Sequence, residues 1–324
     1  MPQPIYNRSG PRFEDLFQAS PDEVVGSMDR AGDDVPEKKP HWPLRLNAAG
    51  LVRERIPVRV EDPFHSGATT VVNCRLSVST HVPHDKRGIH MSRLNHVIAE
   101  SVIRTCRDLD EYTRQLAEAV NHCQYDGPSE VRVDGWLSYW ESVAGRHAGK
   151  EKLSLEEIGL SATARLGRGS SQLTSGLSFD HLTACPCVQK MLQHARRPGD
   201  ATADADRYPA VTHSQRCRSY VSVSNHAGTF PLARLLKEFD KVVFRTQNTL
   251  PREHELKLVY LAHEQPQFIE DVVRELVLAC HRVLRAEHPD CRVEVSSSSM
   301  ESIHSFDIHA SAAVAIRELD GVQG

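Results

Sequence analysis

The sequence predicts an α+β protein in which antiparallel strands and helices form two successive units. Stretches of alternating apolar and polar residues predict strands, as in "TTVVNCRLSVSTHV" at 69–82. Stretches with apolar residues three and four positions apart predict helices, as in "MSRLNHVIAESVIRTC" at 91–106. Both patterns recur in the second half of a 324-residue chain, which is long for a single core. We therefore expect antiparallel sheets with helices on one face, built from two similar units.

In the first half, the predicted order is strand, helix, helix, strand, strand. The second helix places Tyr112, Leu116 and Val120 at helical spacing after a break at Asp108. The two later strands follow from renewed alternation. In chain order these elements cover 69–82, 91–106, 109–123, 129–143 and 152–166.

The second half repeats this succession with more helices. Pro231 stands at a plausible first position of a helix, and another helix starts at Pro266. The predicted strands cover 175–187, 216–225, 290–299 and 305–316, the helices cover 188–197, 231–246, 250–264 and 266–288, and 198–211 forms a loop. We divide the chain into an irregular N-terminal arm (1–47), a first unit (48–172) and a second unit (173–324).

Composition excludes several classes of protein. The chain has 39 Lys and Arg against 43 Asp and Glu, which does not favour broad affinity for nucleic acid or anionic membranes. No stretch approaches the roughly 18 apolar residues that span a bilayer, and the start does not resemble a secretory signal. We therefore expect a cytoplasmic protein. Its eight scattered cysteines do not form the dense pattern of a secreted disulfide scaffold.

The short motif "ACPCVQK" at 184–190 raises the question of a metal site. Cys185 and Cys187 are too close in sequence for both to bind one tetrahedral metal comfortably, so one thiolate with distant ligands is the better hypothesis. A set of Cys, His and carboxylate would suit zinc or ferrous iron with an open position for water. The candidate partners downstream are His213, His254, Glu255, Glu301, His304 and His309.

Ordinary explanations exist for the same residues. A single histidine is more often exposed or hydrogen-bonded than a metal ligand, and helical glutamates usually lie on a solvated face. Cys185 and Cys187 could also form a redox pair, although a separation of one residue strains the disulfide. Spacing alone leaves these alternatives open.

Five motifs resemble the type IB GTP cyclohydrolase I family. In chain order they are "VPHDKRGIHMSRL" (82–94), "ACPCVQK" (184–190), "VTHSQR" (211–216), "QPQFIEDVVR" (265–274) and "VEVSSSSMESIHSFD" (293–307). The resemblance runs from about 55 to 315. It implies tandem tunnelling-fold (T-fold) units, a homotetramer, and conversion of GTP to 7,8-dihydroneopterin triphosphate and formate with a divalent metal.

The resemblance also implies roles for particular residues. Cys185, His213 and Glu255 match the residues of the metal site, which could hold zinc, iron or manganese. His304 would lie beside the metal as a ligand or proton carrier, Glu301 would share the proton transfers, and Cys187 would face the substrate.

The guanine nucleotide needs its own contacts. One carboxylate can accept hydrogen bonds from both N1 and the 2-amino group of guanine, and Glu270 matches the purine anchor of the family. For the triphosphate, "DKRGIHMSR" offers cationic and imidazole side chains at the start of a helix, where anions are favoured. The candidate phosphate contacts are Lys86, Arg87, His90, Arg93 and Arg216.

The sequence departs from the family pattern near its end. Phe306 stands where a second histidine is expected, and a serine run (296–299) precedes the motif. Loss of one proton carrier should affect late steps more than the first hydration of GTP. Besides the full cyclohydrolase, we therefore consider two alternatives: a relative that yields an 8-oxo or ring-opened nucleotide, and a non-catalytic nucleotide or metal binder.

Overall fold

The computed structural model describes residues 34–143, 152–167, 169–195, 211–226 and 228–322. The strands are β1 (Leu46–Glu61), β2 (Thr69–Val82), β3 (Thr105–Cys106), β4 (Ser129–Val143), β5 (Lys152–Gly167), β6 (Ser170–Ala184), β7 (Ser214–Ser224), β8 (Phe244–Arg245), β9 (Arg292–Ser299) and β10 (Ile308–Ala315). The helices are η1 (Val35–Glu37), α3 (Met91–Ser101), α4 (Leu109–Cys123), α5 (Pro186–Ala195), α6 (Leu232–Phe239), α7 (Arg252–Glu264), α8 (Ile269–Leu284) and η2 (Ile316–Leu319). The predicted α+β class is confirmed.

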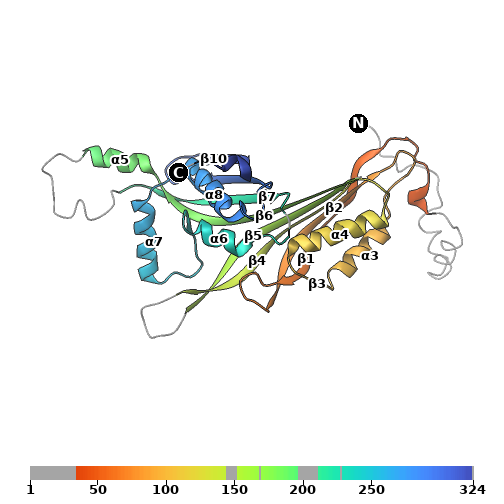
Figure 1. Cartoon of the computed structure of the whole chain (residues 1–324), viewed down its shortest axis with the longest axis horizontal. Coiled ribbons are helices and arrows are strands. Elements are labelled where there is room, and N and C mark those ends of the chain that lie inside the picture. Colours follow the sequence, from red (N-terminus) through yellow and green to blue (C-terminus); the bar gives the residue numbers. More distant parts are fainter. Residues whose placement is uncertain (1–33, 144–151, 168, 196–210, 227, 323–324) are drawn as a thin grey trace, which may run out of the picture.

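The strands form one continuous sheet in the order β10-β9-β7-β6-β5-β4-β2-β1-β3, with β8 paired to β6 (Figure 1). Apart from β3, which runs parallel to β1, neighbouring strands are antiparallel. Each half contributes a hairpin, then helices, then a second hairpin. The topology therefore repeats, and the halves are joined by the pairing of β5 with β6. The boundary between 172 and 173 stays a prediction.

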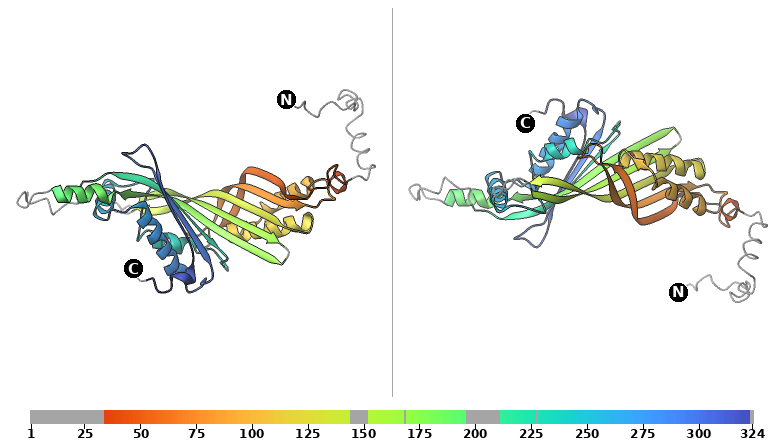
Figure 2. Two further views of the ribbon diagram at one scale, coloured as in Figure 1. Left: turned by 90° about the horizontal axis from the view of Figure 1, so that it is seen from above. Right: turned by 90° about the horizontal axis from the view of Figure 1, so that it is seen from below.

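One face of the sheet carries the core. Alternate residues of the strands point to this face, for example Val72, Leu76, Leu137, Leu177 and Val221, all at most 1% exposed. Helix α4 packs on β4 and β5, and α8 packs on β9 and β10. Both helices bury mostly apolar residues at helical spacing. The two helices cover the two halves of the twisted sheet (Figure 2). The expectation of helices on one face is confirmed.

Most predicted elements are present with shifted ends. The first predicted helix, α3, ends at Ser101 rather than at 106. The predicted break at Asp108 is the start of α4, because the Asp108 side chain accepts a hydrogen bond from the Glu111 N–H and caps that helix. Pro231 is the N-cap of α6 rather than its first residue. The long strand β1 was not predicted, and it begins at Leu46, inside the predicted arm. The rest of the arm before Asp34 and the loop residues 198–210 lie outside the described residues.

No helix among the described residues is long and apolar enough to cross a membrane.

A cluster of three buried polar side chains, Ser175, Asp110 and His226, links the two halves of the chain. Ser175 of β6 donates its hydroxyl hydrogen bond to Asp110 of α4 (2.6 Å), and its Oγ lies 2.7 Å from Nε2 of His226. Asp110 is only 4% exposed, and burial raises the pKa of its carboxyl to about 7. Burial lowers the pKa of His226 to about 4. Between about pH 4 and pH 7, therefore, the Asp110 carboxyl is protonated and the His226 ring is neutral, unlike the same side chains in water.

This shift makes stability depend on pH. The folded-state pKa of Asp110 lies above its unfolded value, so the carboxyl contributes stability at low pH that is lost as pH rises through about 7. Asp110→Asn cannot ionise. The difference in unfolding free energy, variant minus wild type, should therefore rise by about 2 kcal/mol between pH 5 and pH 8. Urea unfolding at a fixed protein concentration measures it.

The matched control is Asp85→Asn, which removes an exposed carboxylate. The unfolding free energy of this variant should change with pH in the same way as that of the wild type. If the unfolding free energy of Asp110→Asn also depended on pH as that of the wild type does, the raised pKa of the buried Asp110 carboxyl would be contradicted.

Candidate functional site

The carboxyl end of β6 and the start of β7 bring Cys185 and His213 together. The antiparallel pairing continues to Ala184 opposite Ser214. Beyond it, the Cys185 N–H donates to the His213 carbonyl (3.0 Å), and the Thr212 hydroxyl donates to the Cys185 carbonyl (2.7 Å). Two potential ligands, a thiol and an imidazole, thus belong to neighbouring strand ends. We call this place the β6–β7 corner.

The segment after β9 brings further polar groups to the β6–β7 corner. Met300 N–H donates to the Arg216 carbonyl, which extends the β7–β9 pairing towards His213. Ser302 Oγ lies 3.3 Å from Nδ1 of His213. The His304 ring is perpendicular to the His213 ring, with 6.4 Å between centroids. The structure therefore brings His213 and His304 together within a single chain.

Glu301 has a defined orientation near the same loop. Ser299, which is buried, donates its hydroxyl hydrogen bond to Glu301 Oε1 (2.7 Å). The Glu301 N–H donates to Asp307 at 3.3 Å. The serine run forms the regular end of β9, where Ser297 and Ser299 point inward. Ser299 and Ser302 are contacts that sequence reasoning missed, since a serine run carries no specific signal.

Phe306 stacks on His304. Their rings are 5.1 Å apart and nearly parallel, with an angle of 9°. The aromatic side chain that stands in place of an expected histidine thus contacts the imidazole. It can hold the ring of His304 but cannot carry a proton.

The thiols around the β6–β7 corner differ in environment. Cys185 is half-buried, and Cys187 is exposed in the first turn of α5. Cys217 is buried, lies 3.2 Å from the Thr183 hydroxyl, and has its pKa raised by burial. Cys217 therefore stays a neutral thiol, which leaves Cys185 and Cys187 as the accessible ones.

Glu255 lies in the first turn of α7 and is exposed. The opposite end of α7 contacts the β6–β7 corner, because His263 Nε2 is 3.3 Å from the Thr212 carbonyl. Eight residues separate Glu255 from His263, or about 12 Å along a helix. Sequence reasoning missed His263; its place at the end of the "YLAHE" helix gave no signal.

The donor set of the predicted metal site fits a divalent ion, since it combines sulfur, imidazole and carboxylate. Two of its members, Cys185 and His213, are held side by side by backbone hydrogen bonds. The third, Glu255, is not brought within 4.8 Å of both of them: it lies in the first turn of α7, about 12 Å along the helix from His263. Among the described residues, the one cluster of three potential ligands within 4.8 Å of one another is Asp34, Glu37 and His90, in the other half of the chain.

The start of α8 is tied to the β6–β7 corner. Gln267 N–H donates to the Ala184 carbonyl (3.1 Å), one residue before Cys185. Glu270 follows in the first turn of α8, exposed and without a hydrogen-bond or ion-pair partner among the described residues. The predicted purine anchor is thus a free carboxylate three residues from this contact.

The candidate phosphate contacts divide into two groups. Arg216 is exposed on β7, three residues from His213. His90 and Arg93 lie at the start of α3, at the end of the molecule opposite to α5 and α7 (Figure 1). Within one chain, the structure does not bring these two groups together.

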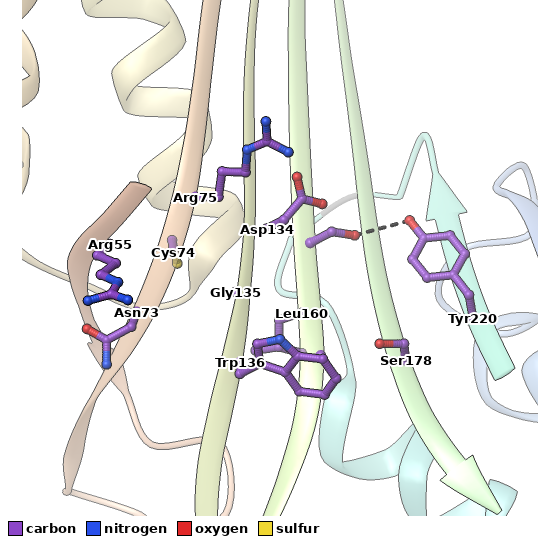
Figure 3. Close-up of a pocket in the computed structure, with 12 residues that line it drawn as sticks. Arg55, Asn73, Cys74, Arg75, Asp134, Gly135, Trp136, Leu160, Ser178 and Tyr220 are labelled. Atoms are coloured by element: carbon purple, nitrogen blue, oxygen red, sulfur yellow. Dashed lines mark hydrogen bonds between the residues drawn. The ribbon is translucent and has the colours of Figure 1, made fainter. Parts of the chain in front are cut away.

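The face of the sheet opposite the helices holds a hollow of about 450 Å³ (Figure 3). Arg55 lies at one side and Tyr220 at the other, with Trp136 between them. On the neighbouring strand, a Cβ at Gly176 would lie 2.5 Å from both the Tyr220 hydroxyl and Ser161 Oγ, so a larger residue there would have to displace these side chains. None of the predicted site residues lines this hollow.

The family model that matches this chain and the relatives that resemble it point to the same kind of protein. A model of the family described as "Type I GTP cyclohydrolase folE2" matches residues 33–310. A protein of Thermoplasma volcanium named GTP cyclohydrolase MptA is 29% identical over 283 residues, covering 86% of this chain and 93% of the relative. One of Aeropyrum pernix with the same name is 29% identical over 287 residues, covering 86% and 94%.

Among solved structures, uricase from Arthrobacter globiformis aligns with a TM-score of 0.48 and 8% sequence identity, covering 83% of this chain and 94% of the uricase. The family match spans most of the chain and includes every residue of the β6–β7 corner. The chain therefore belongs to the type I GTP cyclohydrolase family.

Proposed function

We propose that the protein uses a divalent metal to open the imidazole ring of GTP at C8 and releases formate, giving 7,8-dihydroneopterin triphosphate. The observation that carries this proposal is the β6–β7 corner. There, Cys185 and His213 are neighbours, His304 lies beside His213, and the start of α8 is attached. A chain of this family needs a metal ligand pair, a proton carrier and a purine anchor in one place.

Cys185, His213 and Glu255 would hold the metal, with zinc, ferrous iron and manganese all acceptable to these donors. When bound, such an ion lowers the pKa of a coordinated water and supplies a nucleophile at neutral pH. Ser302 Oγ, at 3.3 Å from Nδ1 of His213, fixes the orientation of the imidazole and leaves Nε2 for binding.

The remaining side chains bind and exchange protons with the substrate. Glu270 would accept hydrogen bonds from N1 and the 2-amino group of guanine, which orients C8. His304 and Glu301 would move protons during ring opening and formate release, and Ser299 holds the Glu301 carboxylate for that task. Cys187, exposed at the start of α5, would face the nucleotide.

We further infer that the complete site is shared between copies of the chain in a homotetramer of tandem T-fold units. His90 and Arg93 lie at the end of the molecule opposite to the β6–β7 corner (Figure 1). Of the candidate phosphate contacts, Arg216 is the one that belongs to the corner. A neighbouring copy that presented its α3 end would supply the others.

Phe306 supports a second candidate function. It stacks on His304 in the position of an expected proton carrier. A site lacking this carrier could complete the first hydration and release an 8-oxo or ring-opened nucleotide. A third candidate, non-catalytic binding, predicts no turnover with any of the three metals.

Product analysis separates these candidates. The metal-loaded protein is incubated with GTP, and the products are identified by mass spectrometry. We expect formate and dihydroneopterin triphosphate in equal amounts. An 8-oxo or ring-opened nucleotide as the final product would replace the leading proposal with the second, and unchanged GTP with all three metals would leave the third.

Cys185→Ala should lose bound metal, because a methyl group cannot replace a thiolate ligand. We expect metal content, measured by plasma mass spectrometry on the purified chain, to fall from about one ion per chain to well below a tenth of that. Cys187→Ala is the matched control and should keep its metal. Equal metal in the two variants would remove Cys185 from the ligand set.

Glu270→Ala should weaken GTP binding by about 2–4 kcal/mol, or roughly 30- to 800-fold in Kd, because guanine would lose a charged acceptor for two donors. Calorimetry with a non-hydrolysable GTP analogue measures the change. Glu275→Gln, further along the same helix, is the control and should bind normally. Unchanged affinity in Glu270→Ala would refute the purine-anchor assignment.

A further inference from the structure

A short acidic segment, Asp34–Glu37, lies on the basic end of the first half. Glu37 Oε2 is 2.5 Å from Lys86 Nζ, and Glu37 Oε1 is 2.8 Å from Nε2 of His90. Asp34 Oδ2 accepts from Arg93 (3.0 Å) and lies 3.3 Å from Nδ1 of His90. Both ring nitrogens of a histidine that is only 4% exposed therefore face carboxylates.

Backbone contacts hold this acidic segment in place. The Pro36 carbonyl accepts from the Arg87 N–H (2.9 Å), and the Tyr125 hydroxyl lies 3.2 Å from the same oxygen and 2.7 Å from the Gly88 carbonyl. These contacts join residues about 50 to 90 positions apart in the sequence. The segment is therefore bound to this surface by tertiary contacts and not by the local chain.

The cluster is not a good cation site. Lys86 and Arg93 already neutralise the two carboxylates, and a metal ion between them would lie next to both cations. Hydrogen bonds from Lys86 and His90 hold the pKa of Glu37 below its ordinary value, so this carboxylate stays ionised. The arrangement is that of an anion bound by two cations and an imidazole.

We propose that Asp34 and Glu37 act as an internal competitor that occupies the binding place of the substrate's triphosphate. This inference rests on the proposed function, which assigns His90 and Arg93 to that triphosphate. The carboxylate oxygens make charge-assisted contacts with Lys86, His90 and Arg93, which are the contacts that phosphate oxygens would make. Triphosphate can bind only when the acidic segment leaves.

The test is binding of inorganic triphosphate to the full chain, measured by calorimetry. Asp34→Asn with Glu37→Gln removes both charges and keeps side-chain size. We expect triphosphate to bind about tenfold more tightly, the change expected when a site that is free in about one molecule in ten becomes fully open. Glu37→Gln alone, for use if the double variant does not fold, should give a smaller gain of about threefold.

Two controls locate the effect. Glu100→Gln with Glu118→Gln removes two exposed carboxylates elsewhere and should leave the affinity unchanged. Adding Lys86→Gln to the double variant should abolish the gain. Unchanged or weaker binding in the double variant, or a gain that survives Lys86→Gln, would overturn the proposal.

The outcome also separates this inference from the proposed function. Tighter triphosphate binding without any turnover of GTP would keep the internal competitor and refute the cyclohydrolase. Turnover of GTP with no gain in triphosphate affinity would do the reverse.

Discussion

The antiparallel register of β6, β7 and β9 is the constraint on which the candidate site depends. It places Ala184 opposite Ser214 and Cys217 opposite Ser299, so that Cys185, His213 and Met300 leave the sheet together. A slip of one residue would turn the inward residues of a strand to the open face. Val221, which is fully buried, would then be exposed, and the loss of apolar burial would oppose the slip. The buried residues of these strands therefore fix the positions of Cys185, His213 and Met300, which lie outside the core.

A buried polar row crosses β6, β7 and β9, in contrast to the apolar core in the middle of the sheet. His181 of β6 is fully buried and hydrogen-bonded to Ser219, which in turn contacts Ser297 of β9 at 2.6 Å. Burial lowers the pKa of His181 to about 4, so its ring is neutral near pH 7. Such a row of side-chain hydrogen bonds has fewer alternative packings than apolar side chains have. It gives this part of the sheet a defined packing, four residues before Cys185 on the same strand.

Much of the fold and part of the site were predictable from sequence, and the exceptions have physical reasons. Regular alternation predicted β2, β4 and β6, and helical spacing predicted α4 and α8. Alternation is interrupted in β1 by an irregularity between Arg53 and Ile56, where Arg55 has a φ of 59°, so this strand was missed. The motifs predicted the neighbourhood of Cys185, His213 and His304. Ion pairs such as that of Asp34 with Arg93 join residues 59 positions apart and have no local signature.

The distance between the two ends of the molecule determines how the acidic segment would regulate substrate binding. The β6–β7 corner and the acidic segment belong to different halves, so the proposed competitor does not cover the proposed metal ligands of its own chain. If copies share sites, displacement of the acidic segment in one copy opens the triphosphate position that its neighbour's corner uses. Substrate then has to supply the free energy of displacing two carboxylates before it is held. Nucleotides with fewer phosphates make fewer of the replacing contacts, so the same competition favours a triphosphate over a monophosphate.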